Sequence, residues 1–355
     1  KYGDERRTDI QKAADTELEI EDLIAEEDVV VTISHQGYVK RLPISTYRKQ
    51  RRGGMGVGSG IVEEDFVEHL FIASTHDNLL LFTSKGKAFM IKVHEVPQAS
   101  RMAKGKFIAN FVSLAQGEKV TSFIPVRKFE EGKFLVMATA TGQIKKCDLT
   151  DFENTRRGGI IAIGLDPKDE LIEVELTDGK QEIFLATRKG KAIRFPESLV
   201  RSMGRGAGGV RGVNLEAKDH VIGMEVVNKN ATLLSVTEKG FGKRSEVEEY
   251  RITSRGGKGV TNIKVTDKNG EVVGLKCVTD KDDLMIMTKE GMVVRCSVKD
   301  IRETGRVAQG VRLINLKKAS DKVTAIAKVE PEEEEPGAVS AEKSEQPEKP
   351  AKSEK

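Results

Sequence analysis

The sequence predicts an all-β protein built from six copies of one repeat of about fifty residues. Six segments share an apolar run, a Ser or Thr, two further residues and a Gly. The hydroxyl residues are Ser34, Thr83, Thr139, Thr187, Thr237 and Thr288, and the glycines are Gly37, Gly86, Gly142, Gly190, Gly240 and Gly291. Six mostly-β units suit a propeller-type ring better than a helical solenoid, and neighbouring units must pack together because one small sheet cannot bury its own faces.

Each repeat begins with a predicted β-hairpin. An apolar run such as LLLF before Thr83 has the length of a strand buried on both faces. The polar residues and the glycine that follow supply the turn, since glycine tolerates positive φ. In the second strand basic residues alternate roughly with apolar ones, which predicts that the positive charges face outward. These basic residues are Lys40, Lys145, Arg194, Lys243 and Arg295.

An arginine stands fifteen residues after every turn glycine. The six positions are Arg52, Arg101, Arg157, Arg205, Arg255 and Arg306, and four residues later stand Gly56, Gly105, Ile161, Gly209, Gly259 and Gly310. Turn geometry does not require an arginine at a fixed distance. Two interpretations are therefore open: each arginine clamps neighbouring blades through carbonyls or a carboxylate, or it contacts DNA.

The charge is distributed unevenly along the chain. Residues 1–28 hold 11 acidic and 4 basic side chains, and residues 330–355 hold 9 and 4, so the overall charge of +3 leaves +15 on the remainder. A basic body with acidic ends suggests a polyanion as partner. We expect an acidic connector over residues 1–28, the repeat domain over 29–329, and a disordered Glu/Pro/Lys-rich tail over 330–355. The tail either aids solubility or competes with DNA for the basic surface.

Several classes of function lack support in the sequence. No apolar run approaches the length of a membrane helix. The three cysteines form no CxxC pair and the five histidines no HExxH motif, which disfavours zinc sites and disulfides and favours a reducing cytoplasm. A GxGxxG match at residues 204–209 is followed by no helix pattern, and no phosphate-binding GxxxxGK[ST] loop is present. We therefore expect a binding domain with no catalytic residue, no metal and no cofactor of its own.

Basic, glycine-rich loops are the candidate binding elements. Their glycines let backbone N–H groups approach phosphate oxygens, and the absence of aromatic residues from the loops favours duplex over single-stranded DNA. No helix is placed to enter a major groove, so base-specific reading is not expected. The candidate DNA-binding residues are Gln50, Arg51, Arg52, Gly53, Gly54, Gly56, Lys40, Arg41, Lys49, Arg101, Lys104, Arg156, Arg157, Arg205, Arg255, Lys258 and Arg306.

The heptapeptide QRRGGMG at residues 50–56 resembles the GyrA box of the C-terminal domain of the bacterial DNA gyrase A subunit, usually QRRGGKG. SRGGKG at residues 254–259 is a partial second copy, and YGDERRTDI at residues 2–10 resembles the end of that protein's cleavage domain. Met55 stands where the family usually has lysine or arginine, so the box has one positive charge fewer.

This resemblance implies a six-bladed β-pinwheel whose basic rim wraps duplex DNA, so that gyrase, an ATP-dependent type IIA topoisomerase, introduces negative supercoils. It implies that the DNA-cleaving tyrosine lies in the cleavage domain, and that the gyrase B subunit hydrolyses ATP with Mg²⁺. The implied partners are those two components and DNA, with no membrane, in a bacterial cytoplasm near the nucleoid. Two alternatives remain: the equivalent domain of topoisomerase IV, whose family usually lacks an intact box, and a propeller-like scaffold that binds proteins.

Overall fold

The computed structural model describes residues 24–34, 36–43, 67–100, 103–156, 158–227, 230–290, 292–316, 318 and 320–329. These residues form β-strands and short 3-10 helices, with no α-helix among them. No helix in this part of the chain has the length and apolar character needed to cross a membrane. Almost all of the connector and all of the tail that the sequence predicts lie outside the described residues, as does the heptapeptide at residues 50–56.

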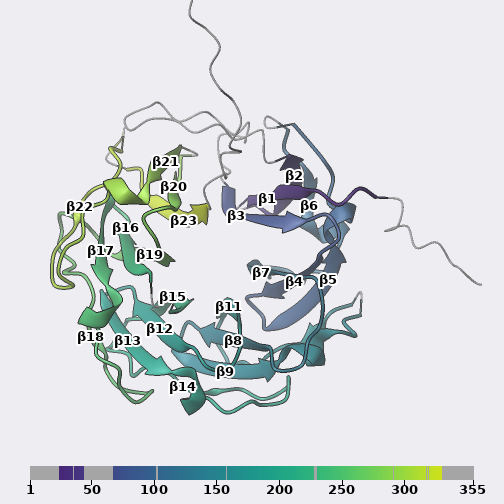
Figure 1. Cartoon of the computed structure of the whole chain (residues 1–355), viewed down its shortest axis with the longest axis horizontal. Helices are drawn as coiled ribbons and strands as arrows, with labels where there is room; N and C mark the ends of the chain where they lie inside the picture. The colour runs from purple at the N-terminus through teal and green to yellow at the C-terminus, as the bar shows by residue number, and fades with distance from the viewer. Residues whose placement is uncertain are drawn as a thin grey trace, which may run out of the picture.

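Six antiparallel hairpins form the centres of six small sheets arranged in a ring (Figure 1). The hairpins pair β1 (Asp28–Ser34) with β2 (Tyr38–Pro43), β4 (Asn78–Thr83) with β5 (Lys87–Lys92), β8 (Phe134–Thr139) with β9 (Gln143–Asp148), β12 (Glu182–Thr187) with β13 (Lys191–Pro196), β16 (Thr232–Thr237) with β17 (Phe241–Glu246), and β20 (Asp283–Thr288) with β21 (Val293–Ser297). The predicted all-β, six-bladed architecture is therefore confirmed.

The hairpin turn explains the repeated Ser/Thr-x-x-Gly pattern. In the second repeat, the Gly86 N–H donates to the carbonyl of Thr83 at 2.8 Å, and φ of Gly86 is +74°. The N–H of Lys87 donates to the Thr83 hydroxyl at 3.3 Å. The same hydroxyl contact recurs in the first, third, fourth and sixth repeats. The pattern thus encodes a turn closed by one backbone and one side-chain hydrogen bond.

Each blade is completed by an inner strand from its own repeat and an outer strand from the next repeat. The inner strands are β3 (Val67–Ser74), β7 (Val120–Val126), β11 (Leu171–Thr177), β15 (Val221–Val226), β19 (Val272–Val278) and β23 (Val323–Val329). The outer strands are β6 (Lys106–Phe107), β10 (Ile160–Ile161), β14 (Val210–Arg211), β18 (Val260–Thr261) and β22 (Val311–Arg312). The sixth sheet has three strands among the described residues.

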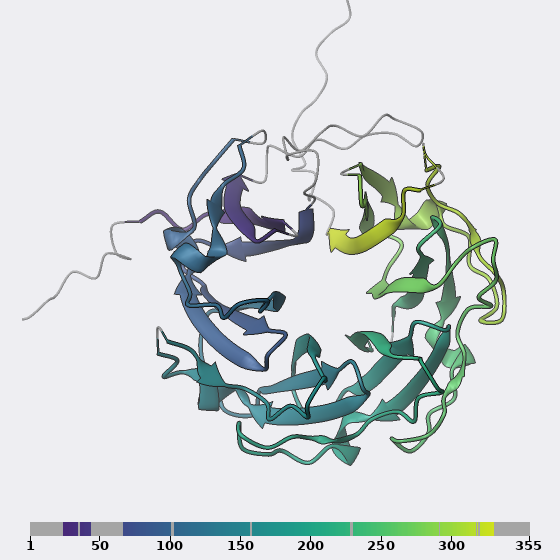
Figure 2. The ribbon, with the colours of Figure 1, turned by 180° about the vertical axis from the view of Figure 1, so that it is seen from behind.

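The apolar core lies between the blades. Leu80 packs in one cluster with Leu135 of the following blade, whereas the adjacent Leu81 packs in another with Val31 of the preceding blade. All five core clusters combine residues of two neighbouring blades in this way. Inner strand β23 of the last blade contacts β3 of the first, which brings the two ends of the ring together (Figure 2).

Short 3-10 helices lead from the hairpins toward the outer strands. They are η3 (Val93–Glu95), η5 (Leu149–Phe152), η6 (Glu197–Leu199), η7 (Val247–Glu249) and η8 (Val298–Asp300), with η4 (Ile108–Asn110) after β6. The segment between each of these helices and the outer strand crosses from one blade to the preceding one. We call these segments the crossing arms: residues 96–105, 153–159, 200–209, 250–259 and 301–310, of which 101, 102 and 157 are not described.

Candidate nucleic-acid interface

The crossing arms form the outer edge of the ring (Figure 1). Of the six phased arginines, Arg205, Arg255 and Arg306 lie on the described parts of these arms. Four arms join the preceding blade through a parallel bridge before the outer strand pairs: Arg41 with Gln98, Lys146 with Ser202, Arg194 with Ile252, and Arg244 with Glu303. Two attachment points hold each of these arms, so the loop between them projects from a fixed base. This is the region in which sequence analysis placed the DNA contacts.

The glycine before each outer strand is required by the backbone. Gly105, Gly159, Gly209, Gly259 and Gly310 all have positive φ, between +72° and +92°. A Cβ atom at Gly259 would lie 2.4 Å from the carbonyl oxygen of Ala192, and one at Gly105 would lie 2.3 Å from that of Val39. These glycines therefore permit close contact between an arm and the preceding blade, whatever the arm binds.

In the third repeat the pre-strand glycine comes two residues earlier than in the other described arms, which corrects the predicted phase. Its pre-strand glycine is Gly159, seventeen residues after the turn glycine, whereas the other described arms have nineteen. Ile161, which the fixed count aligned with the glycines, belongs to β10. Arg157 precedes its glycine by two residues instead of four, so its match to the other five arginines is a coincidence of counting.

The arginines fifteen residues after the turn glycine lie at blade junctions. The Arg255 guanidinium donates to the carbonyls of Leu199 and Arg211, both at 3.1 Å. The Arg306 guanidinium donates to the carbonyl of Thr261, the last residue of the preceding arm's outer strand, at 2.9 Å. The clamp interpretation is thus supported for these two residues. Arg205 differs: its carbonyl accepts from Lys145, and its guanidinium bonds to no residue in the described part of the chain.

The basic residues of the second hairpin strands do not face outward as predicted. Lys40, Lys145 and Lys243 are between 0% and 5% exposed. Lys40 Nζ donates to the carbonyl of Ala103 at 2.7 Å, and Lys145 Nζ donates to that of Ala162 at 2.8 Å. Burial lowers the pKa of Lys243 to about 8. Lys40 and Lys145 secure crossing arms from beneath, the latter also through the Arg205 carbonyl, whereas Lys243 donates to Ser245 on its own strand. Lys40 is therefore not available to DNA.

The arginine four residues after the turn glycine also binds the next repeat in the first, fourth and fifth blades. Arg41 Nε donates to the carbonyl of Val96 at 2.7 Å. Arg194 Nη1 donates to the carbonyl of Val247 at 2.7 Å, and Arg244 Nε donates to that of Ile301 at 2.6 Å. The prediction of outward charge is therefore wrong for Arg194 as well, whose side chain is 10% exposed and pairs with Glu182. Arg295 is likewise 13% exposed and pairs with Asp283 within its own blade.

Exposed cations nevertheless remain on the arms. Lys104, Arg156 and Lys258 are exposed, and none of their side chains forms a hydrogen bond within the described residues. Lys104 Nζ lies 6.0 Å from the centre of the Tyr38 ring. Lys104 and Lys258 stand eighteen residues after their turn glycines, as Met55 does in the first repeat. The remaining candidates lie outside the described residues: Lys49, Gln50, Arg51, Arg52, Gly53, Gly54, Gly56, Arg101 and Arg157.

A second series of arginines with a common offset, absent from the predicted DNA-binding residues, also lies on the arms. Arg201, Arg251 and Arg302 stand eleven residues after their turn glycines, and all three are exposed. Counting every basic residue from the turn glycine would have revealed them, because they occur in three successive repeats. The glycine-rich composition of the loops drew attention to the other series instead.

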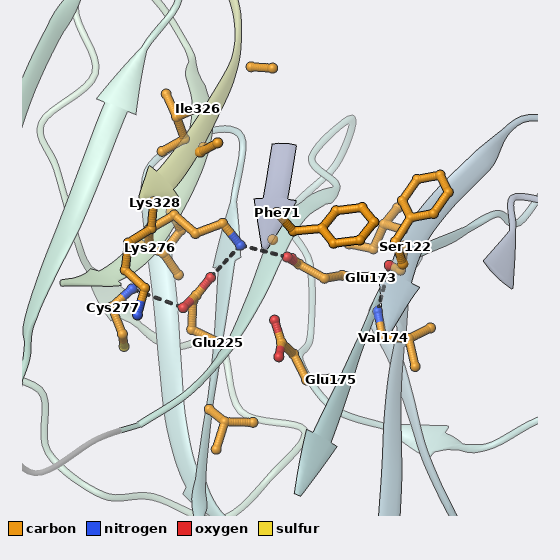
Figure 3. A pocket seen from close by; sticks show the side chains of 18 of the residues that line it. Phe71, Ser122, Glu173, Val174, Glu175, Glu225, Lys276, Cys277, Ile326 and Lys328 are labelled. Atoms are coloured by element: carbon orange, nitrogen blue, oxygen red, sulfur yellow. Dashed lines mark hydrogen bonds and ion pairs between the residues drawn. The ribbon is translucent and has the colours of Figure 1, made fainter. Parts of the chain in front are cut away.

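At the centre of the ring, a polar cluster joins three inner strands (Figure 3). Lys276 Nζ on β19 lies 2.9 Å from Glu173 Oε1 on β11 and 2.6 Å from Glu225 Oε1 on β15. Burial and the nearby Glu225 carboxylate raise the pKa of Glu175 to about 8. Burial alone would lower the pKa of Lys276, but the carboxylates of Glu173 and Glu225 raise it well above its usual value.

This cluster lines a cavity of about 700 Å³ at the hub. Glu173, Glu175 and Glu225 lie close enough together to hold a cation, but Lys276 already bonds two of them. The hydrogen bond from the Cys277 N–H to Glu225 Oε2, at 2.9 Å, further fixes that carboxylate. The cluster is therefore best described as a tie between blades.

A ring of six small sheets that exchange outer strands and bear cations along the edge defines a β-pinwheel, a class of β-propeller. The chain matches the family described as DNA gyrase C-terminal domain, beta-propeller, over residues 28–74, 77–127, 133–178, 181–228, 231–279 and 282–330. The chain belongs to this family. The family resemblance inferred from the heptapeptide is thereby confirmed.

Curated relatives agree with this assignment. The DNA gyrase A subunit of Halalkalibacterium halodurans is 53% identical over 336 residues, which cover 94% of this chain and 40% of the relative. The DNA gyrase A subunit of Escherichia coli strain K12 is 46% identical over 335 residues, which cover 94% and 38%. The chain therefore spans about two fifths of the length of these relatives.

Solved structures share the architecture. A structure of the DNA gyrase A C-terminal domain matches with a TM-score of 0.75 at 28% identity, covering 85% of this chain and 99% of that one. The C-terminal domain of DNA topoisomerase IV matches with a TM-score of 0.70 at 29% identity, covering 86% and 94%. The fold is common to both enzymes, and the curated relatives favour gyrase.

Proposed function

We propose that this chain binds duplex DNA along its outer edge and bends it around the ring, as the wrapping domain of a DNA gyrase. The observation that carries the proposal is the recurrence, on successive crossing arms, of exposed cations whose side chains form no hydrogen bond or ion pair with the described residues. Duplex DNA is stiff over about 150 base pairs, so bending it tightly costs several kcal/mol. Phosphate contacts distributed along an arc offset that cost by releasing counterions.

The division of labour within the parent enzyme is part of the same proposal. The chain contributes no catalytic residue and holds no cofactor, while DNA cleavage belongs to the cleavage domain, and ATP hydrolysis with Mg²⁺ belongs to the gyrase B subunit. We place the protein in the bacterial cytoplasm at the nucleoid. The box at residues 50–56 is proposed as a primary DNA contact, with Met55 reducing its charge relative to the usual sequence.

Salt-dependent binding of the purified chain to plain duplex DNA tests the proposal. We expect binding at low salt, with the logarithm of the affinity falling steeply and linearly as the logarithm of the salt concentration rises. The absence of binding at low salt would contradict the proposal and favour a protein-binding scaffold. A minicircle assay separates gyrase from topoisomerase IV, because a gyrase domain should constrain DNA strongly in one hand.

The box has its own test in the reconstituted enzyme. Replacing residues 50–56 with alanines should abolish negative supercoiling and leave relaxation intact, because only supercoiling requires the wrap. Full supercoiling by that variant would contradict the role of the box. Deleting residues 330–355 should tighten the wrap if the tail competes with DNA, whereas unchanged topology would indicate a solubilising tail.

A further inference from the structure

We propose that the two arginine series of the crossing arms have separate roles. Arg201, Arg251 and Arg302 contact DNA phosphates, whereas Arg255 and Arg306 lock the blades together. This inference rests on the proposed function, since it names the residues that carry the DNA contact. The proposed DNA contacts stand four residues before the arginines that lie fifteen residues after each turn glycine.

We call Arg201, Arg251 and Arg302 the phosphate series. The backbone on either side of each of these arginines is fixed. Arg251 follows Tyr250, which is 1% exposed and whose carbonyl accepts from Arg194, and it precedes Ile252, the bridge partner of Arg194. In the same way, Arg302 follows the buried Ile301 and precedes the bridge residue Glu303.

Arg201 has the same setting between Val200 and Ser202. Val200 is fully buried, and Ser202 bridges Lys146 while its hydroxyl donates to Asp148 at 2.7 Å. All three arginines therefore project from an ordered backbone, and the entropy lost on binding a phosphate is confined largely to the side chain.

The side chains of Arg201, Arg251 and Arg302 are free, whereas those of Arg255 and Arg306 are engaged. Arg201, Arg251 and Arg302 are exposed and form no hydrogen bond or ion pair with the part of the chain that the structure describes. Arg255 would have to give up two carbonyl bonds to meet a phosphate, and Arg306 would have to give up one. A free guanidinium can donate two parallel hydrogen bonds to a phosphate without breaking existing contacts.

The phosphate series runs over three consecutive arms, those of the fourth, fifth and sixth repeats. Eleven residues after the turn glycine, the second repeat has Pro97 and the third has Glu153. Their outer strands end in the exposed apolar residues Phe107 and Ile161. The geometry therefore points to an arc of phosphate contacts over β14, β18 and β22. Arg48 occupies this offset in the first repeat and lies outside the described residues.

Two multiple variants of the full chain separate the roles. R201Q/R251Q/R302Q should keep the melting temperature of the wild type and reduce the slope of log affinity against log salt by about 3, since each lost phosphate contact removes about 0.9. R255Q/R306Q should lower the melting temperature and, assayed well below it, retain the wild-type slope. R201K/R251K/R302K should restore most of the slope, because lysine keeps the charge.

The control removes three exposed cations from loops between blades: K128Q/K180Q/K281Q. It should change the slope much less than the phosphate-series variant. An equal reduction of the salt slope in R201Q/R251Q/R302Q and in the lysine control would overturn the inference. An unchanged slope or a lowered melting temperature in R201Q/R251Q/R302Q would also overturn it. Failure of the wild-type chain to bind DNA would instead overturn the proposed function.

Discussion

Replacing Gly259 with alanine tests the close contact between a crossing arm and its blade. Gly259 has a φ of +72°, a conformation that costs an alanine about 1–2 kcal/mol. The new Cβ would lie 2.4 Å from the Ala192 carbonyl oxygen, about 1 Å closer than ordinary contact. Relief of that overlap requires β18 to separate from β13 at the pairing of Val260 with Ala192. Loss of one or two ladder hydrogen bonds adds about 1–2 kcal/mol.

Gly132 provides the matched control. Its φ is +78°, but a Cβ atom added there would have no atom within 4 Å among the described residues. Gly132→Ala should therefore lower the free energy of unfolding by only about 1–2 kcal/mol, against about 3 kcal/mol for Gly259→Ala. In a chain of this size each kcal/mol corresponds to about 2 °C in melting temperature.

Thermal unfolding followed by circular dichroism measures both variants, and the effect of alanine on the unfolded chain cancels in their difference. We expect Gly259→Ala to melt about 2–4 °C below Gly132→Ala. Equal melting temperatures would show that the arm relaxes away from the blade without loss. The glycine would then not be needed for the arm to lie against the blade.

Three further predictions concern the charged ties between blades. Lys276→Met should lower the free energy of unfolding by about 2–4 kcal/mol in chemical denaturation, because Glu225 is left buried and unpaired, whereas Lys281→Met on the surface should have no effect. Because the pKa of Glu175 is raised to about 8, the folded state binds more protons than the unfolded state between about pH 4.5 and pH 8, so this group destabilises the fold as pH rises. Glu175→Gln should therefore flatten the fall of melting temperature across that range, and an unchanged profile would refute this assignment. Arg244→Gln should lower the melting temperature by about 2–4 °C through loss of its contacts with the Ile301 carbonyl and with the carboxylates of Asp280 and Glu303, and a variant as stable as the wild type would show that the arm needs none of these contacts.

The repeat and its hairpins were predictable from sequence because they depend on local chemistry. The turn glycine and the hydroxyl residue three positions earlier make all of their turn hydrogen bonds within five residues. Strand length and apolar character likewise lie within one run, as in residues 79–82. Six copies of such a unit leave a ring as the natural way to bury every blade.

The roles of the basic residues were less predictable because their partners come from other repeats. Lys145 appears as an outward charge in an alternating strand, yet the arm of the next repeat covers it and supplies the Arg205 carbonyl sixty residues away. Alternation specifies which side chains share a face but does not reveal what covers that face. The tie between Glu173, Glu225 and Lys276 is hidden for the same reason, since its members lie on three repeats.

The central claim is that duplex DNA follows the outer edge of the ring and is bent there. The most direct test relaxes closed circular DNA with a nicking and religating enzyme in the presence of the chain, and then measures the linking number after the protein is removed. If DNA is bent around the ring, the linking number shifts by an amount that grows with protein concentration and is strongly reduced in R201Q/R251Q/R302Q. Binding with no shift in linking number, or an undiminished shift in that variant, would contradict the claim.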